Sequence, residues 1–146
     1  MEKIINFKIV TPEKTVYVDE IFQVTIPTMD GEITVLPYHI PLVTVLLAGD
    51  LIIKDKDGEH HLAISGGFLE VKSNSEIIIL ADNAERAEDI DLERAEQARK
   101  RAIEQMEKAK SDENIDYAKL QAVIDREMNR LKIGRKYKKL PKAKQE

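Results

Sequence analysis

The sequence predicts an N-terminal antiparallel β-sandwich followed by a C-terminal antiparallel hairpin of two α-helices. From Ile4 to Leu80 the apolar residues come in short runs rich in Val, Ile and Thr, interrupted by Gly, Pro, Asp and Asn, which is typical of strands. From Leu92 to Leu131 there is no Gly or Pro, and apolar residues recur three and four positions apart, which is typical of helices. The character of the chain changes once, at Ile90 and Asp91.

About eight to ten short strands are expected in the first part, at close and regular spacing and without a helix between them. Ile5, Phe7 and Ile9 alternate with polar residues and are therefore predicted to share the buried face of the first strand. Asp57-Gly58 predicts a hairpin, because Gly adopts positive φ without steric cost. Pro27 is expected to break the chain after the third strand.

Each helix is predicted to begin at an aspartate. Asp91 can accept hydrogen bonds from the free N–H groups of the first turn, Glu93 adds negative charge near the positive end of the helix dipole, and Asp116 repeats the arrangement. A short polar loop around Asp112 predicts that the two helices run antiparallel. The apolar stripe of the first helix is narrow and rich in alanine, so its contact is expected to be close but weak. Gly134 is a predicted helix end.

These patterns divide the 146 residues into a β-sandwich domain over 1–84, a helical hairpin over 85–134 and a basic tail over 135–146, which is predicted to be mobile. The absence of Cys excludes a disulfide framework, a thiolate nucleophile and a Cys-based zinc site. The N-terminus lacks a signal-peptide pattern, and no apolar run approaches the ~20 residues that span a bilayer. We expect a protein inside the cell that meets a membrane only through a partner.

The net charge of −4 conceals a basic C-terminus. Between residues 132 and 146 one acidic residue, Glu146, stands against Lys132, Arg135, Lys136, Lys138, Lys139, Lys142 and Lys144. Such a tail suggests an anionic partner, which can be an acidic protein surface, nucleic acid or lipid. A nucleic-acid-binding protein would stack bases on aromatic residues, yet the basic region offers only Tyr117 and Tyr137, which disfavours that alternative.

No set of residues predicts catalysis or a metal site. The sequence shows no Ser-His-Asp set, no close pair of carboxylates and no metal-ligand spacing. His60-His61 resembles a metal pair, but adjacent residues of a strand point to opposite faces, so one ion could not readily use both. Catalytic residues and metal ligands are therefore both predicted to be absent.

Four separated motifs resemble one family. They are Thr11-Pro12-Glu13, the run from Gly31 to Leu42, the segment from Ser65 to Val71, and Ile90-Asp91-x-x-Arg94-Ala95. In this order and spacing, from about Phe7 to Leu131, the chain is similar to the epsilon subunit of the F-type proton-translocating ATP synthase. The resemblance implies a ten-stranded sandwich and a two-helix hairpin in a non-catalytic subunit of the central stalk.

The resemblance also implies partners and a role in ATP synthesis and proton transport. Such a subunit couples the rotor to the ring of c subunits, and its hairpin inhibits ATP hydrolysis by swinging from a folded to an extended position. The implied partners are the gamma subunit, the c-ring loops, and the alpha and beta subunits, with an acidic loop of beta meeting the basic C-terminal helix. The implied location is the cytoplasmic face of the bacterial cell membrane, as a peripheral part of the complex, with no nucleic acid and no required cofactor.

Bacterial members of the family imply a regulatory ATP site. The matching positions are Glu85, Ile90, Asp91, Arg94, Ala95, Arg101, Arg126 and Arg130. If the hairpin turns near Asp112, Arg94 faces Arg130 and Arg101 faces Arg126 across it, provided that all four share its inner edge. A triphosphate between these arginines would give each guanidinium a charge-assisted contact.

A plainer alternative is that nearby carboxylates neutralise the arginines in surface ion pairs of little energetic value. The candidates are Glu93, Glu96, Glu104 and Glu127. Because the chain has no G-x-x-x-x-G-K-[ST] loop, any nucleotide bound here would be a regulatory ligand and not a substrate. A stand-alone nucleotide sensor, which needs no gamma partner, is the second alternative.

Glu32 and His39 match family positions at the bottom of the sandwich, where members meet the c-ring loops and gamma. The alternative reading is an ordinary turn carboxylate and a loop histidine held between two prolines.

Overall fold

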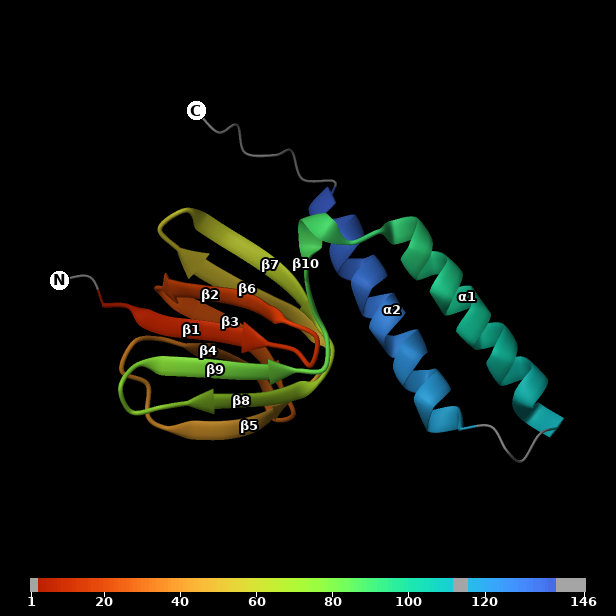
Figure 1. Ribbon diagram of the computed structural model, residues 1–146, viewed down its shortest axis with the longest axis horizontal. Helices are drawn as coiled ribbons and strands as arrows, with labels where there is room; N and C mark the ends of the chain where they lie inside the picture. The colour runs from red at the N-terminus through yellow and green to blue at the C-terminus, as the bar shows by residue number, and fades with distance from the viewer. Residues whose placement is uncertain (1–2, 112–115, 139–146) are drawn as a thin grey trace. The chain divides into compact units, whose positions relative to one another are not determined.

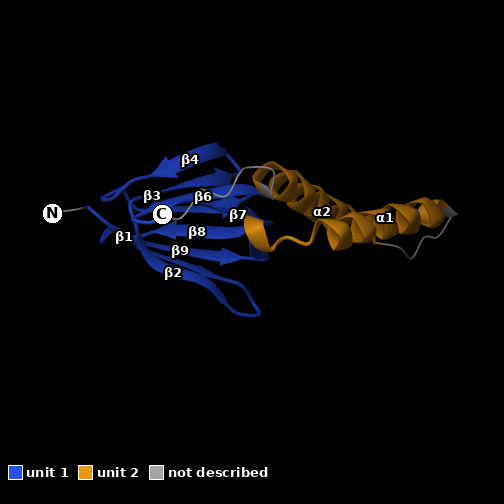
Figure 2. Ribbon diagram, turned by 90° about the horizontal axis from the view of Figure 1, so that it is seen from above, with its two compact units in different colours: residues 1–86 blue, residues 87–146 orange. Residues whose placement is uncertain are grey.

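The computed structural model describes residues 3–111 and 116–138 of the chain. The chain divides after Arg86 into two compact units, coloured separately in Figure 2. Within its described part, the first unit consists of ten strands (Figure 1). They are Ile5–Val10 (β1), Thr15–Ile21 (β2), Gln23–Thr28 (β3), Gly31–Val35 (β4), Leu42–Leu46 (β5), Gly49–Asp55 (β6), Gly58–Ile64 (β7), Gly67–Val71 (β8), Glu76–Ala81 (β9) and Ala84–Arg86 (β10).

The strands form a single curved sheet that folds into a sandwich. Its order is β10-β7-β6-β3-β5-β8-β9-β1-β2, and β4 pairs with β3. The predicted sandwich is confirmed, but the expectation of a wholly antiparallel arrangement is wrong at one place, since β1 and β9 pair in parallel. A parallel pair needs a long connection, and strands β2 to β8 supply it.

The enclosed face of the sheet is lined almost entirely by aliphatic side chains. Ile5, Phe7 and Ile9 are buried, as their alternation predicted, while Asn6 and Lys8 between them are exposed. The ring of Phe7 meets that of Tyr17 edge-on, with 5.7 Å between the centroids. Alternation along each strand therefore decides which side chains enter the core.

The predicted hairpin at Asp57-Gly58 is confirmed, and one expectation about the strands fails. Lys56 and Asp57 join β6 to β7, and Gly58, the first residue of β7, has a φ of 122°. Gly67 has a φ of 119°, and a Cβ there would lie 2.1 Å from the carbonyl oxygen of Leu80. Pro27 does not break the chain but lies inside β3, because its carbonyl still accepts a 3.1 Å hydrogen bond from the amide of Leu47.

A buried carboxylate links β2 to the β6–β7 hairpin. Asp55, only 8% exposed, accepts hydrogen bonds from the Tyr17 hydroxyl at 3.0 Å, the His60 Nε2 at 3.0 Å and the Asp57 amide at 2.8 Å. Burial acts to raise the pKa of Asp55, but the Asp57, His60 and Tyr17 hydrogen bonds outweigh it and lower that pKa. Burial, followed by the bond to Asp55, raises the pKa of the Tyr17 hydroxyl.

Replacement of Asp55 should destabilise the sandwich in a pH-dependent way. Asp55→Asn removes a charged acceptor from three donors, so at pH 7 we expect a loss of about 1–3 kcal/mol in the free energy of unfolding. Because the folded-state pKa of Asp55 is lowered, its contribution is fully present above the unfolded pKa, about 3.9, and disappears as the pH falls through the folded value. Urea unfolding of wild type and variant should therefore converge in strong acid.

The exposed Asp57 provides the matched control. Because its amide, not its carboxylate, makes the contact with Asp55, Asp57→Asn should leave the unfolding free energy nearly unchanged at pH 7. A constant difference between wild type and Asp55→Asn from pH 7 to pH 2 would contradict the assigned role.

The second unit is the predicted helical hairpin. After a short 3₁₀ turn at Ala87–Asp89 come α1 (Leu92–Lys108), a second 3₁₀ turn at Ala109–Ser111, and α2 (Tyr117–Lys138). The Asp91 carboxylate caps α1 by accepting from the Arg94 amide at 3.0 Å. Asp116 caps α2 in the same way, accepting from the Lys119 amide at 3.1 Å, so both predicted caps are confirmed.

The predicted helix end at Gly134 is wrong, because α2 continues through Gly134 to Lys138. Gly134 is required by packing: a Cβ there would lie 2.6 Å from Leu92 Cδ2 and 3.1 Å from Ile90 Cγ2. The first part of the predicted mobile tail, 135–138, is therefore helical, and residues 139–146 lie outside the described part of the chain.

A side chain at Gly134 should loosen the hairpin. We expect Gly134→Val to lower the free energy of unfolding by about 1–3 kcal/mol through overpacking against Ile90 and Leu92, although Val favours helix over Gly. Ala118→Val, at an exposed site on the same helix, controls for propensity alone and should cost well under ~1 kcal/mol. Helical circular dichroism during urea unfolding measures both; equal costs would refute the packing argument.

Candidate nucleotide site and partner surfaces

Small residues mediate the contact between the two helices. Ala95 and Ala102 of α1 and Ala109 of the following 3₁₀ turn are buried and recur about every two helical turns. Gly134 packs on Leu92 near one end of the hairpin, and the Tyr117 hydroxyl donates to the Ala109 carbonyl at 2.5 Å near the other. These two contacts establish the predicted antiparallel register.

Two of the predicted phosphate-binding arginines converge on one carboxylate of α2. Arg126 donates through Nε to Glu127 Oε1 at 3.2 Å, and Arg130 donates through Nη1 to Glu127 Oε2 at 2.8 Å. Glu127 is only 2% exposed. For these two arginines the structure therefore shows the neutralised arrangement that the sequence left open as an alternative.

The other two arginines, on α1, are exposed. Arg94 and Arg101 each precede a buried alanine of the helix contact, so they lie along the same edge of α1. Arg101 Nε donates to the Gln97 carbonyl at 3.4 Å, and within residues 3–111 and 116–138 neither guanidinium pairs with a carboxylate. The expected neutralisation by nearby glutamates does not extend to them.

Glu96 serves different arginines from those predicted. It accepts from Arg99 Nη2 at 2.5 Å, and Arg135 Nη2 lies 3.7 Å away, so Glu96 connects α1 to α2. The bond to Arg99 lowers the pKa of Glu96, and Glu96 in turn raises the pKa of Arg99.

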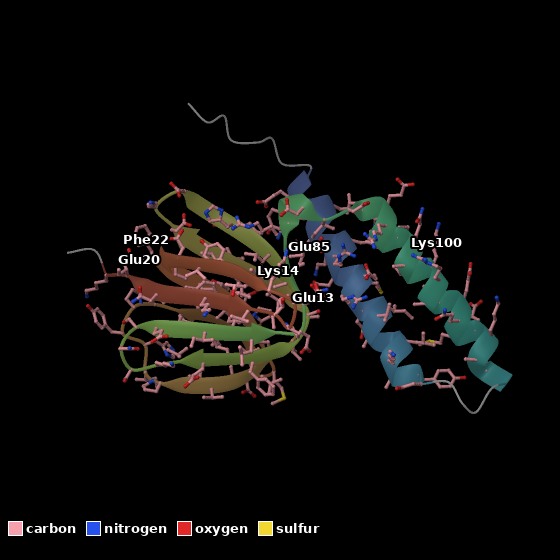
Figure 3. The ribbon with its side chains drawn as sticks, in the orientation of Figure 1. Glu13, Lys14, Glu20, Phe22, Glu85 and Lys100 are labelled. Carbon is pink, nitrogen blue, oxygen red and sulfur yellow. The ribbon has the colours of Figure 1, made fainter. Side chains whose placement is uncertain are left out.

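The remaining residues of the predicted site have clear local roles. Ile90 and Ala95 are fully buried in the second unit, and Asp91 is the helix cap. Glu85 belongs to the first unit, where it lies on β10 opposite Ala63 of β7 (Figure 3). As an ATP site, the set of eight residues stays a prediction.

Glu32 and His39 do not lie at the same end of the sandwich. Glu32 lies close to the β3–β4 turn. At this turn Thr28 pairs with Leu46 of β5, and Leu46 pairs with Gly67 at the start of β8. His39 lies beyond the other end of β4, in a loop held by the Tyr38 amide bond to Ser75 Oγ at 2.9 Å, past the end of β8. The expectation of one shared lower surface is therefore wrong, because the length of β4 separates the two residues.

The outward face of four neighbouring strands carries an apolar surface that the sequence analysis missed. We call it the outer apolar strip; it comprises Val10, Val43, Val45, Phe68, Ile78 and Leu80. Phe68 is 57% exposed, Val43 71% and Leu80 55%. The unbroken run Ile77-Ile78-Ile79-Leu80 was the available signal, since a strand with one wet face would alternate.

The adjacent histidines have separate partners. His60 binds Asp55, whereas His61 Nδ1 lies 3.1 Å from Asp50 and Nε2 lies 2.7 Å from Glu59. Within the described part of the chain, no group of three His, Asp or Glu residues could hold a metal ion. None of the described helices is both long and apolar enough to cross a membrane.

Comparison with known proteins agrees with this architecture of a β-sandwich joined to a helical hairpin. Residues 4–87 match the family model "ATP synthase, Delta/Epsilon chain, beta-sandwich domain", and residues 88–134 match "ATP synthase, Delta/Epsilon chain, long alpha-helix domain". The ATP synthase epsilon chain of Desulforamulus reducens is 46% identical over 134 residues, 92% of this chain and 99% of that one. That of Nitratidesulfovibrio vulgaris is 41% identical over 133 residues, covering 91% and 97%.

Solved structures give the same result. A chain of the Euglena gracilis mitochondrial ATP synthase complex of OSCP, F1 and c-ring matches with a TM-score of 0.65 and 27% identity, over 86% of this chain and 76% of that one. A chain from the central stalk and c-ring of the Tetrahymena thermophila enzyme shares the fold, with a TM-score of 0.58 and 16% identity over 90% and 94%.

The fold and the matches define a non-catalytic subunit of a rotary ATP synthase. The chain belongs to the epsilon-subunit family of the F-type ATP synthase, as its sequence motifs predicted, and its place is in the central stalk.

Proposed function

We propose that this subunit couples the rotor to the c-ring through its sandwich and restrains ATP hydrolysis through its helical hairpin, with ATP as a regulatory ligand. The observation that carries the coupling role is the outer apolar strip, because a group of exposed apolar side chains on a well-formed sheet, here with Glu70 between Val43 and Ile78, is typical of a protein interface. The gamma subunit is the proposed occupant of this strip. As part of this proposal, the subunit is located at the cytoplasmic face of the bacterial membrane, as a peripheral part of the complex.

The two ends of the sandwich are proposed to meet different partners. The loop around His39 exposes Leu36, Tyr38 and Ile40, and it leads directly into Val43 of the strip, so it extends the gamma surface. Glu32 at the opposite end is exposed on β4 and is proposed to face the polar loops of the c-ring. The Euglena relative supports this assignment, since it comes from a complex that contains a c-ring.

The regulatory role rests on the weakness of the helix contact. An alanine stripe buries little area, so folded and extended positions of the hairpin can lie close in free energy, and a ligand or partner can shift the balance. Lys132, Arg135 and Lys136 are exposed near the end of α2 and are proposed to meet an acidic loop of the beta subunit.

A charge in the outer apolar strip should break the gamma contact. Phe68→Glu buries an unpaired carboxylate against gamma, so binding of co-expressed gamma should weaken at least tenfold, roughly 1.4 kcal/mol or more, in a pull-down titration. Lys56→Glu, at an exposed site in the β6–β7 turn outside the strip, is the control and should bind gamma normally. Unchanged binding by Phe68→Glu would place gamma elsewhere.

Loss of an arginine should weaken nucleotide binding. In calorimetric titrations of the full chain, we expect Arg101→Ala and Arg126→Ala each to reduce ATP affinity about tenfold or more, because each removes a charge-assisted bond worth roughly 1.5–3 kcal/mol. ADP should bind more weakly than ATP, and Arg135→Ala, which is exposed and outside the predicted set, should bind ATP as wild type does. Equal affinity in all variants would exclude the arginine cluster as the phosphate site.

A further inference from the structure

Glu127 occupies an unusual position for a glutamate. Its side chain is 3% exposed, whereas glutamate is rarely buried in proteins unless it is paired. The pairing is complete in the sense that each carboxylate oxygen has its own guanidinium, Oε1 with Arg126 and Oε2 with Arg130. The 2.8 Å distance to Arg130 lies in the range of charge-assisted hydrogen bonds, and the 3.2 Å distance to Arg126 is slightly longer.

The same donors would serve a phosphate group. Guanidinium groups bind carboxylate and phosphate oxygens with the same planar fork of N–H donors. The Nε of Arg126 and the Nη1 of Arg130 therefore already hold an anion that belongs to the chain. A ligand phosphate that used these donors would have to replace the carboxylate.

The arginines of α1 differ in this respect. Arg94 and Arg101 are exposed, and no carboxylate within the described ranges 3–111 and 116–138 pairs with them. Of the four arginines predicted to bind phosphate, the two on α1 are therefore open to an anion, and the two on α2 already contact Glu127. The carboxylate that both arginines of α2 share is that of Glu127.

We propose that Glu127 is an internal competitor for the anion site: in the ligand-free chain it holds Arg126 and Arg130, and a phosphate-bearing ligand binds only by displacing it. This inference rests on the nucleotide site of the proposed function and adds its regulation. Displacement exchanges one anion for another, so the ligand must carry more negative charge than a carboxylate. A triphosphate satisfies this condition. A single phosphate group, with a charge of about −1.5 to −2, exceeds the charge of the carboxylate by less and therefore gains less binding free energy when it replaces Glu127.

Removal of this carboxylate charge is the direct test. Glu127→Gln keeps the size of the side chain but removes the negative charge that Arg126 and Arg130 share. In calorimetric titrations of the full chain, ATP and inorganic tripolyphosphate should each bind at least tenfold more tightly to Glu127→Gln than to wild type. Adding Arg126→Ala to this variant should abolish the gain.

Glu96→Gln is the charge-matched control. Glu96 also pairs with two arginines, Arg99 and Arg135, so its replacement changes the net charge equally while leaving Arg126 and Arg130 as they are. Its affinity for both probes should equal that of wild type. Glu127→Asp, which keeps the charge on a shorter side chain, should fall between wild type and Glu127→Gln, and circular dichroism verifies that each variant keeps its helices.

The outcomes separate the inference from the proposed function. If Glu127→Gln binds both probes no better than wild type, or if neither protein binds, Glu127 is not a competitor and the inference is overturned. If wild type nevertheless binds ATP and loses it on Arg126→Ala, the nucleotide site stands without the competitor. If Glu127→Gln gains affinity for tripolyphosphate and ATP binds no better than tripolyphosphate, the competitor stands, and the site is an anion site without selectivity for nucleotide.

Discussion

Burial of one complete face of a curved sheet is the constraint on which the first unit depends. Because nearly every inward position must be apolar, the polar groups that do lie inside need partners from the chain itself. Asp55 meets this condition with three donors, one of which, the Tyr17 hydroxyl, comes from a strand at the far side of the sheet order. Because the core is formed by the inward face of the sheet, the outer apolar strip on the outward face does not contribute to it and can contact a partner.

The second unit follows a different constraint, close approach of two helices. Alanines on α1 and Gly134 on α2 bring the backbones together but supply little hydrophobic area. Apolar residues of α2, Ile124, Leu131 and Ile133, are buried as well, and the solvent-exposed ion pairs of Glu96 with Arg99 and Arg135 add little. An element held in this way responds to ligands more readily than the sandwich does.

Features with local causes could be predicted from the sequence. The alternation of Ile5 and Phe7, the turn at Gly58 and the caps at Asp91 and Asp116 each depend on residues a few positions apart. Features with distant causes could not. The parallel β1–β9 pair and the packing of Gly134 on Leu92 depend on residues far apart in the chain. Glu127 was a candidate partner of the arginines from its position in the sequence, but its burial was not predictable.

The shortest strand has a mechanical consequence. The chain leaves the sandwich through β10, which pairs with β7 over three residues, Ala84–Arg86, and places the Arg86 guanidinium 5.4 Å from the centre of the Tyr17 ring on β2. A pulling force transmitted along the hairpin reaches this strand before it reaches any longer ladder. We expect β10 to peel away first, lengthening the tether while the core of the sandwich stays intact.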